Sequence, residues 1–343
     1  MNIARSESLY TCRAVLIALL VVVGVTTLPH DLVVRYSALT GDAKRVQWVY
    51  RRVNVDQAPV DVAFIGTSHA MQAVDDASIE SALRNSGRPL NVANLAVPYH
   101  GRDLHHFVFQ ELLEARNPKL VVLEVRHAEG RDGHPVFAEI ADVGQVLGSS
   151  LRIYLRALQD LARLPNRQLS LFMRNFLQPD VEDTLQRPNE NLHSYRADIR
   201  PLAGDGAEAG MKRGRAFNAR VNASAWRKSL EPLEYRYARN IVREMCEKAQ
   251  ASGTEMTFLY LPFYSAPAKP HDLKFYRQCG EVWFMHPEVI ASTNKWRDKN
   301  HLNDDGSALM APWLAERISN RVAEVRADAT RRPSGPFVLP VRP

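Results

Sequence analysis

The sequence is poor in cysteine, with three among 343 residues, and aromatic residues make up only 8%. So few cysteines exclude a disulfide-stapled mini-domain, and a single long apolar run excludes a multi-pass membrane protein. Glycine shows no collagen-like excess, and neither sign of charge dominates as it does in disordered chains. With 45% hydrophobic residues, the chain can bury an ordinary core in one large domain or two small ones.

The excess of basic residues is small. A formal net charge of +6 would permit nucleic-acid binding. The basic residues are spread along the chain, however, and no zinc-finger, RRM or helix-turn-helix signature accompanies them. We therefore expect no nucleic-acid partner, and binding through the basic stretch 204–215 is the weakest alternative.

The single long apolar run covers 14–28 and follows Arg5 and Arg13. At 1.5 Å per residue, its ~15 residues reach only about 22 Å, which is short for a spanning helix and leaves a cleaved signal peptide open. A small-x-small cleavage pattern is lacking, so we expect residues 1–30 to form an uncleaved signal anchor in the inner membrane. The positive-inside rule then puts the bulk of the chain in the periplasm. A buried N-terminal helix is the alternative.

Two of the cysteines, Cys246 and Cys279, fall in the part predicted to be exported, whereas Cys12 lies at the cytoplasmic edge. Their spacing matches no zinc site. They could form a disulfide, or they could be two small core residues, and the sequence leaves both possibilities open.

Apolar runs alternate with helical periodicity over most of the chain. We expect residues 31–57 to form a helical stalk and residues 58–325 to form a single domain. Strand-like runs and helix-like segments follow one another, at 60–65, 76–84, 89–96, 102–115, 119–125, 231–251 and 256–261. Short continuous apolar strands separated by helices indicate an α/β fold with a parallel sheet covered on both faces. The alternation is lost over about 132–230, which we interpret as a helical insertion, and 326–343 predicts a disordered tail.

Two short motifs carry residues for nucleophilic catalysis. The first predicted strand runs into Gly66-Thr67-Ser68, which would place the Ser68 hydroxyl at the carboxyl end of a parallel strand. Near the other end of the chain, Asp298 and His301 lie three residues apart, so that a carboxylate could orient an imidazole. An alcohol needs a base to take its proton, and that base needs a group to hold its tautomer. Each residue also has a structural alternative, Ser68 as a helix cap and the other two as loop residues.

These motifs resemble those of the SGNH (GDSL-like) hydrolases, particularly the membrane-anchored envelope members related to alginate O-acetyltransferases and D-alanine transfer proteins. The first block corresponds to 64–70 and the last block to 298–306. The resemblance implies a three-layer flavodoxin-like parallel sheet, with Ser68 as nucleophile, His301 as base and Asp298 as its partner. It implies no cofactor.

The middle blocks of the family match less well. The second block resembles Asn94 to Gly101, and it implies Gly101 as an oxyanion donor, with Asn94 beside the substrate. The third block departs from the usual Gly-x-Asn-Asp, so Arg126 or His127 would have to donate in place of the missing amide. His69 follows the nucleophile and either contacts substrate or faces water at the start of a helix.

Three further histidines, His100, His105 and His106, gather near the start of one predicted helix. They look like metal ligands, but no acidic residue accompanies them at ligand spacing. We therefore expect no metal and interpret them as residues of a solvated helix start.

The resulting hypothesis is an extracytoplasmic O-acyltransferase or acyl esterase that acts on a cell-envelope or secreted polysaccharide. The resemblance favours a transferase that works beside a multi-pass membrane acyltransferase. The alternative is a non-catalytic protein that uses the same cleft to bind glycan or to scaffold an envelope assembly. The altered third block favours this alternative, and the Ser68, His301 and Asp298 set disfavours it.

Overall fold

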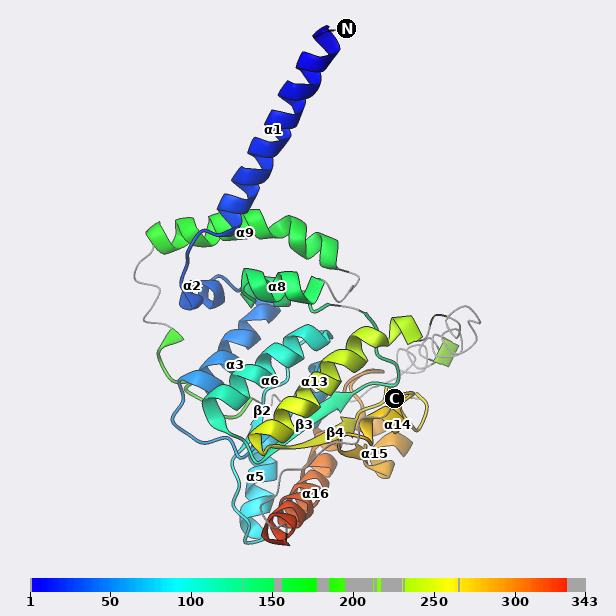
Figure 1. The fold of residues 1–343 in the computed structure, drawn as a ribbon. Helices are drawn as coiled ribbons and strands as arrows, with labels where there is room; N and C mark the ends of the chain where they lie inside the picture. The colour runs from blue at the N-terminus through cyan, green and yellow to red at the C-terminus, as the bar shows by residue number, and fades with distance from the viewer. Residues whose placement is uncertain are drawn as a thin grey trace.

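Five parallel strands form the centre of the protein in the computed structural model (Figure 1). Their bounds are β1 Val62–Ile65, β2 Val92–Asn94, β3 Leu120–Val125, β4 Glu255–Tyr260 and β5 Glu281–Phe284. The structure describes residues 2–131, 133–150, 156–177, 185–194, 212, 215–216, 230, 232–264 and 266–331. The strand order β2-β1-β3-β4-β5 is that of a flavodoxin-like sheet and confirms the predicted α/β class.

Helices cover both faces of this sheet. One face carries α3 (Lys44–Asn54), α6 (Arg102–Arg116) and α13 (Arg236–Ser252), and the other carries α4 (Ser68–Ala73), α5 (Asp76–Asn85) and α16 (Asp304–Arg331). Along β1, Ala63 belongs to the first core and Phe64 to the second, because successive side chains of a strand point to opposite faces. All six residues of β3 are buried, which explains why five of the six are apolar.

The fifth strand is absent from the sequence prediction. β5 lies at the edge of the sheet, where its first residue, Glu281, is exposed and only two of its four residues are fully buried, so its apolar pattern is weak. A short helix, α14 (Leu273–Tyr276), lies between β4 and β5. Two more short elements lie between β5 and α16: α15 (Pro287–Ala291) and η3 (Thr293–Lys295).

The stalk predicted for 31–57 is helical, but it forms part of the domain. It contains α2 (Leu32–Ser37), η1 (Gly41–Ala43) and α3. Val46, Val49 and Val53 recur at helical spacing and are buried in the core on one face of the sheet. The apolar stripe of α3 therefore packs against the domain instead of standing away from it.

The predicted insertion, 132–230, is described only in pieces. These contain α7 (Phe137–Ile140), α8 (Val143–Ser150) and α9 (Ala157–Leu177). α9 is a single helix that continues through Pro165. The basic stretch 204–215 lies almost entirely outside the described residues. At the other end of the chain, α16 reaches Arg331, so the first residues of the predicted tail are helical, and 332–343 lie outside the description.

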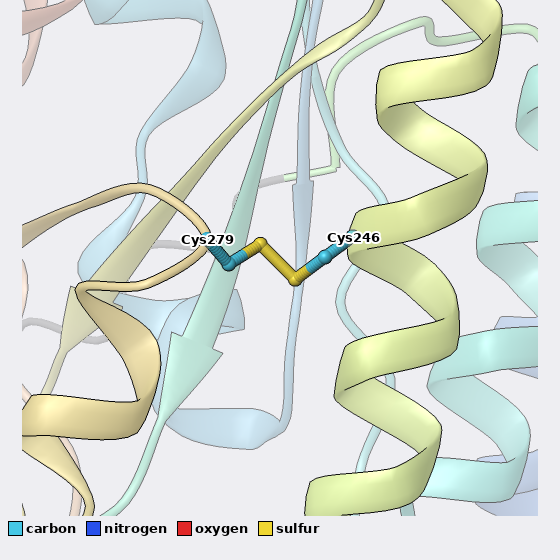
Figure 2. Close-up of a disulfide and its surroundings, with 2 residues drawn as sticks. All are labelled: Cys246 and Cys279. Atoms are coloured by element: carbon cyan, nitrogen blue, oxygen red, sulfur yellow. A yellow bond between two sulfur atoms is a disulfide. The ribbon is translucent and has the colours of Figure 1, made fainter. Parts of the chain in front are cut away.

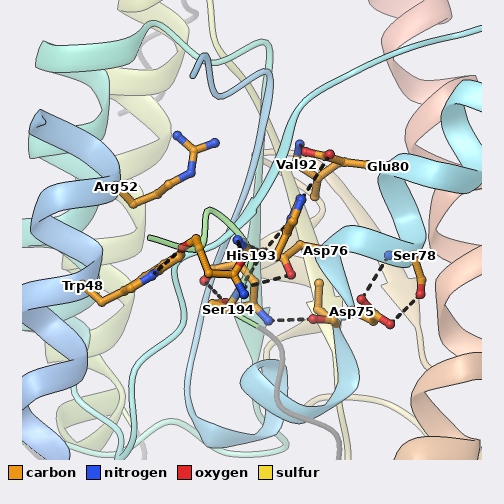
Figure 3. A network of polar contacts seen from close by, with 12 residues as sticks. Trp48, Arg52, Asp75, Asp76, Ser78, Glu80, Val92, His193 and Ser194 are labelled. Carbon is orange, nitrogen blue, oxygen red and sulfur yellow. Dashed lines mark hydrogen bonds and ion pairs between the residues drawn. The ribbon is translucent and has the colours of Figure 1, made fainter. Parts of the chain in front are cut away.

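Residues 185–194, a described piece of the insertion, lie against the domain as a strap (Figure 3). The Asn189 amide donates to Asp56 Oδ2 and to the Trp48 carbonyl, each at 3.0 Å. The Ser194 hydroxyl donates to the Asn94 carbonyl at 2.8 Å, and the Ser194 N–H donates to Asp76. The strap thus ends beside the carboxyl end of β2.

A disulfide joins Cys246 on α13 to Cys279, two residues before β5, with their Cα atoms 5.9 Å apart (Figure 2). Of the two possibilities that the sequence left open, the structure therefore has the paired cysteines. The remaining cysteine, Cys12, is exposed on α1 (Asn2–Thr26). None of the helices in the described ranges is both long enough and apolar enough to cross a membrane.

Candidate active site

Ser68 begins α4 at the carboxyl edge of the sheet. β1 ends at Ile65, Gly66 and Thr67 make the turn, and Ser68 is the first residue of the helix. The Thr67 side chain caps this helix by accepting from the His69 N–H at 3.2 Å. Thr67 thus takes the capping role that the sequence allowed for Ser68, and the half-buried Ser68 hydroxyl is left to other partners.

Asp298 and His301 lie together in the loop before α16. An antiparallel bridge between Trp296 and Leu302 closes this loop. Asp298 accepts from the backbone N–H groups of Asn300 and His301 at 2.7 and 3.0 Å, and His301 Nδ1 lies 2.8 Å from Asp298 Oδ2. Partial burial raises the pKa of Asp298, but the hydrogen bonds from His301 and the backbone outweigh it and hold that pKa well below its ordinary value.

The tertiary structure brings these two motifs into contact. His301 Nε2 lies 2.8 Å from Ser68 Oγ, although the residues are 233 positions apart in the chain. Ser68, His301 and Asp298 therefore form one continuous hydrogen-bonded chain, in the order that a hydroxyl nucleophile, a base and an orienting carboxylate require.

A buried carboxyl group accepts hydrogen bonds from the residues on either side of Ser68. Glu124, on the neighbouring strand β3, accepts from the Thr67 N–H at 2.6 Å, from the Thr67 hydroxyl at 2.9 Å and from the Ala70 N–H at 3.3 Å. Gly66 makes this approach possible, because a Cβ there would lie 2.5 Å from Glu124 Oε2. The sequence analysis missed this role, although a Glu at the end of an otherwise apolar strand is a signal for one.

His69 is buried at the site rather than exposed to water. Its ring packs edge-on against Phe263 and His301, with centroid distances of 5.1 and 5.4 Å. Burial, with the nearby charges of Arg126 and His301, lowers the pKa of His69 to about 4, so the ring is neutral at pH 7. The Arg126 guanidinium lies over the Phe263 ring, 5.2 Å from its centroid.

Gly101, Asn94 and His127 are the other residues predicted to hold the oxyanion or the substrate, and each has different surroundings. Gly101 lies between β2 and α6, where a Cβ would come within 2.2 Å of the His134 backbone, so glycine is required there. The Asn94 amide donates both hydrogens inside the protein, to the carbonyls of Ala70 and Val74, and is not available to substrate. His127 Nδ1 lies 3.2 Å from the Lys269 carbonyl and so links two loops.

The three histidines near α6 are buried or half-buried, which corrects the prediction of a solvated helix start. Two of them pair with acidic residues distant in sequence, His100 with Glu129 at 3.0 Å and His106 with Glu244 at 3.2 Å. His105 Nδ1 lies 3.1 Å from Arg102. Within the described ranges, no group of three or more His, Cys, Asp or Glu residues could hold a metal ion.

A buried polar network around Glu129 supports the loop after β3. Glu129 accepts from the Arg102 guanidinium, from the Arg126 N–H at 3.2 Å and from the Tyr276 hydroxyl at 3.3 Å. Burial raises the pKa of Glu129, but Arg102 and His100 outweigh it and keep that pKa well below its ordinary value. Arg102 also donates to the Glu124 carbonyl at 2.8 Å. The network therefore ties the backbone of Arg126 to the start of α6.

Comparison with known proteins finds no matching family and no matching curated protein. Among solved structures, the chain is similar to a "putative acylhydrolase" from Bacteroides fragilis NCTC 9343, with a TM-score of 0.34 and 10% sequence identity. The match covers 78% of this chain and 91% of that chain. So distant a likeness carries no argument about function, and the chemistry of the site rests on its own geometry.

Proposed function

We propose that the protein is a serine acyl-transfer enzyme of the SGNH type, with Ser68 as nucleophile, His301 as general base and Asp298 as its orienting partner. The observation that carries the proposal is the 2.8 Å contact between Ser68 Oγ and His301 Nε2. Because Asp298 accepts at Nδ1 of the same ring, Nε2 is left to accept the hydroxyl proton.

The reaction runs in two halves. Ser68 Oγ forms a bond to the carbonyl carbon of an acyl ester while His301 Nε2 takes its proton. The tetrahedral intermediate then loses the donor alkoxide, which recovers that proton from His301 and leaves an acyl ester on Ser68. In the second half, a water or a sugar hydroxyl gives its proton to His301 and attacks the same carbon. The bond to Ser68 Oγ then breaks, Oγ recovers the proton from His301, and a carboxylic acid or a new ester leaves.

Stabilisation of the oxyanion falls to groups other than the missing amide. The Ser68 N–H, at the first position of α4, has no partner within its own helix. Gly101 supplies a second candidate N–H from the loop after β2. The Arg126 guanidinium lies over the Phe263 ring, and its charge acts on His69 beside the nucleophile. One such donor is worth about 2.7–4 kcal/mol in serine proteases, so one of these groups must act if the enzyme is efficient.

We further propose that the acceptor is a cell-envelope or secreted polysaccharide and that α1 attaches the protein to the outer face of the inner membrane. The exposed apolar side chains of α1 support the attachment. The disulfide between Cys246 and Cys279 supports an oxidising compartment such as the periplasm. A multi-pass membrane acyltransferase that exports acyl groups would then supply the donor.

The test uses the full chain in detergent micelles and p-nitrophenyl acetate as the activated ester. The wild type is expected to release p-nitrophenol and to carry an acetyl group that intact-mass and peptide mass spectrometry locate on Ser68. Ser68→Ala is expected to do neither. Addition of a polysaccharide acceptor then separates the two activities, because a transferase acetylates the polymer and an esterase releases only acetate.

Equal rates and equal masses for wild type and Ser68→Ala, with both proteins folded by circular dichroism, would refute the proposal. That result would favour the alternative of a non-catalytic, glycan-binding or scaffold protein, which a polysaccharide-binding measurement by calorimetry would then address.

A further inference from the structure

Helix α1 exposes a continuous apolar surface. Figure 1 shows it projecting from the rest of the protein, with its C-terminal end at α9. Its large apolar side chains are 44–62% exposed: Val15, Leu16, Ile17, Leu19, Leu20, Val21, Val22 and Val23. The membrane attachment proposed above rests on this surface, and the inference that follows rests on that attachment but not on acyl transfer.

Helix α9 lies across the C-terminal end of α1 (Figure 1). The Gln168 amide donates to the Thr26 carbonyl at 3.1 Å, so the two helices meet where α1 ends. One side of α9 is fixed to the domain, because Leu164 and Leu171 are buried and Arg167 donates to the Ala141 carbonyl at 2.8 Å. The orientation of α9 relative to α1 is therefore held by packing.

A different side of α9 exposes large apolar residues. Those that are 44–83% exposed are Leu158, Leu169, Met173, Phe176 and Leu177. At 3.6 residues per turn, all of them except Leu177 fall within an arc of about 60°. A polar stripe runs beside this arc: Gln159, Arg163, Asn166 and Ser170. So many large apolar side chains on one exposed arc are unusual for a face in contact with water.

The chemistry of α9 fits a lipid surface. Its apolar arc lies where the apolar surface of α1 ends, so the two surfaces meet at α9. Its single acidic residue, Asp160, is buried, whereas Arg163 on the polar stripe is exposed. An apolar arc flanked by basic and polar residues is typical of a helix that lies in the membrane interface beside anionic head groups.

We propose that α9 is an interfacial helix whose apolar arc lies in the outer layer of the membrane that α1 enters. α1 and α9 together would then form one lipid-binding surface, which sets the height and orientation of the domain and of Ser68 above the membrane.

The test places a single environment-sensitive nitrobenzoxadiazole label on the full chain and adds vesicles of phosphatidylethanolamine and phosphatidylglycerol. Native Cys12 reports on α1. In a Cys12→Ser background, Phe176→Cys reports on α9. The matched control is Ile290→Cys on α15, a 38% exposed apolar position on the face of the sheet opposite to α9. We expect a blue shift of emission and quenching by spin-labelled lipid at positions 12 and 176, and neither effect at 290.

Each other outcome overturns the inference. A response at position 12 without one at 176 would leave α1 attached and α9 in water. No response at any position would overturn the attachment as well, whatever the result of the acyl-transfer test. A blue shift at 176 that rises with protein concentration in the absence of vesicles would show that a second copy of the chain covers the arc.

Discussion

Replacement of Glu124 tests whether a side chain outside the proposed catalytic set holds Ser68 in place. Glu124 Oε2 accepts from the N–H groups of Thr67 and Ala70, and Glu124→Ala would leave both buried donors without an acceptor. At about 1–3 kcal/mol for each buried donor, unfolding should become easier by about 2–6 kcal/mol. Displacement of the Ser68 turn should also lower kcat/KM by about 100-fold or more, because reacting groups tolerate little misplacement.

The conservative variant separates hydrogen bonding from packing. Glu124→Gln keeps one oxygen that can accept from both N–H groups, while its amide can donate to the Thr67 hydroxyl. Its free energy of unfolding should therefore fall by only about 2 kcal/mol, since the bonds lose charge assistance but keep their geometry. We expect its activity to stay within about tenfold of the wild type.

Urea unfolding followed by circular dichroism and p-nitrophenyl acetate hydrolysis measure the two effects. The control is Glu255→Ala at the amino end of β4, where the carboxylate pairs with Arg321 away from the site. Loss of that partly exposed pair should cost about 1 kcal/mol or less and leave activity unchanged. The reasoning is wrong if Glu124→Ala keeps wild-type kcat/KM, or if Glu124→Gln is as damaging as Glu124→Ala.

Three further predictions concern other parts of the structure. Asp298→Asn should lower kcat about 10³–10⁴-fold with the fold intact, and a fall of less than tenfold in steady-state kinetics would argue against an orienting role. Paired Cys246→Ser and Cys279→Ser should lower the free energy of unfolding by about 4 kcal/mol, because the bridge closes a separation of 33 residues; an unchanged urea midpoint would contradict this. Asp76 and Glu80 raise the pKa of His193. The stabilisation that His193 contributes is therefore complete below its ordinary pKa and is lost as pH rises through the raised pKa. His193→Gln should remove that loss above pH 6.5, the ordinary pKa of histidine, and an unchanged pH profile of the urea midpoint would count against it.

Local sequence was enough to predict most of the sheet. The strands lie within short, largely apolar runs at 60–65, 89–96, 119–125 and 256–261. Burial on both faces makes such runs recognisable without any knowledge of their neighbours. β5 was not predicted because, at the edge of the sheet, only two of its four residues are fully buried, which leaves a weak apolar pattern.

The candidate site was predictable in its residue types. Asp298 and His301 are close in sequence, so their pairing is a local property, and Ser68 follows a strand whose carboxyl end is a usual ligand position. The 2.8 Å contact between Ser68 and His301, however, depends on how the first strand and the last loop come together in the sheet. No pattern of residues along the chain measures that distance.

Burial of polar side chains was decided by the tertiary structure alone. The Asn94 amide donates to backbone carbonyls, and the His69 ring packs against Phe263. Glu124 and Glu129 accept from backbone N–H groups of neighbouring loops. A polar residue becomes structural when other elements supply its partners, and most of these partners lie 20 or more positions away in the chain. By itself, the sequence determined the strands, their helices and the chemistry available at each end of the chain. The packing of those elements decided which polar groups meet and which remain free to act, because contacts between distant residues exist only once the sheet is assembled.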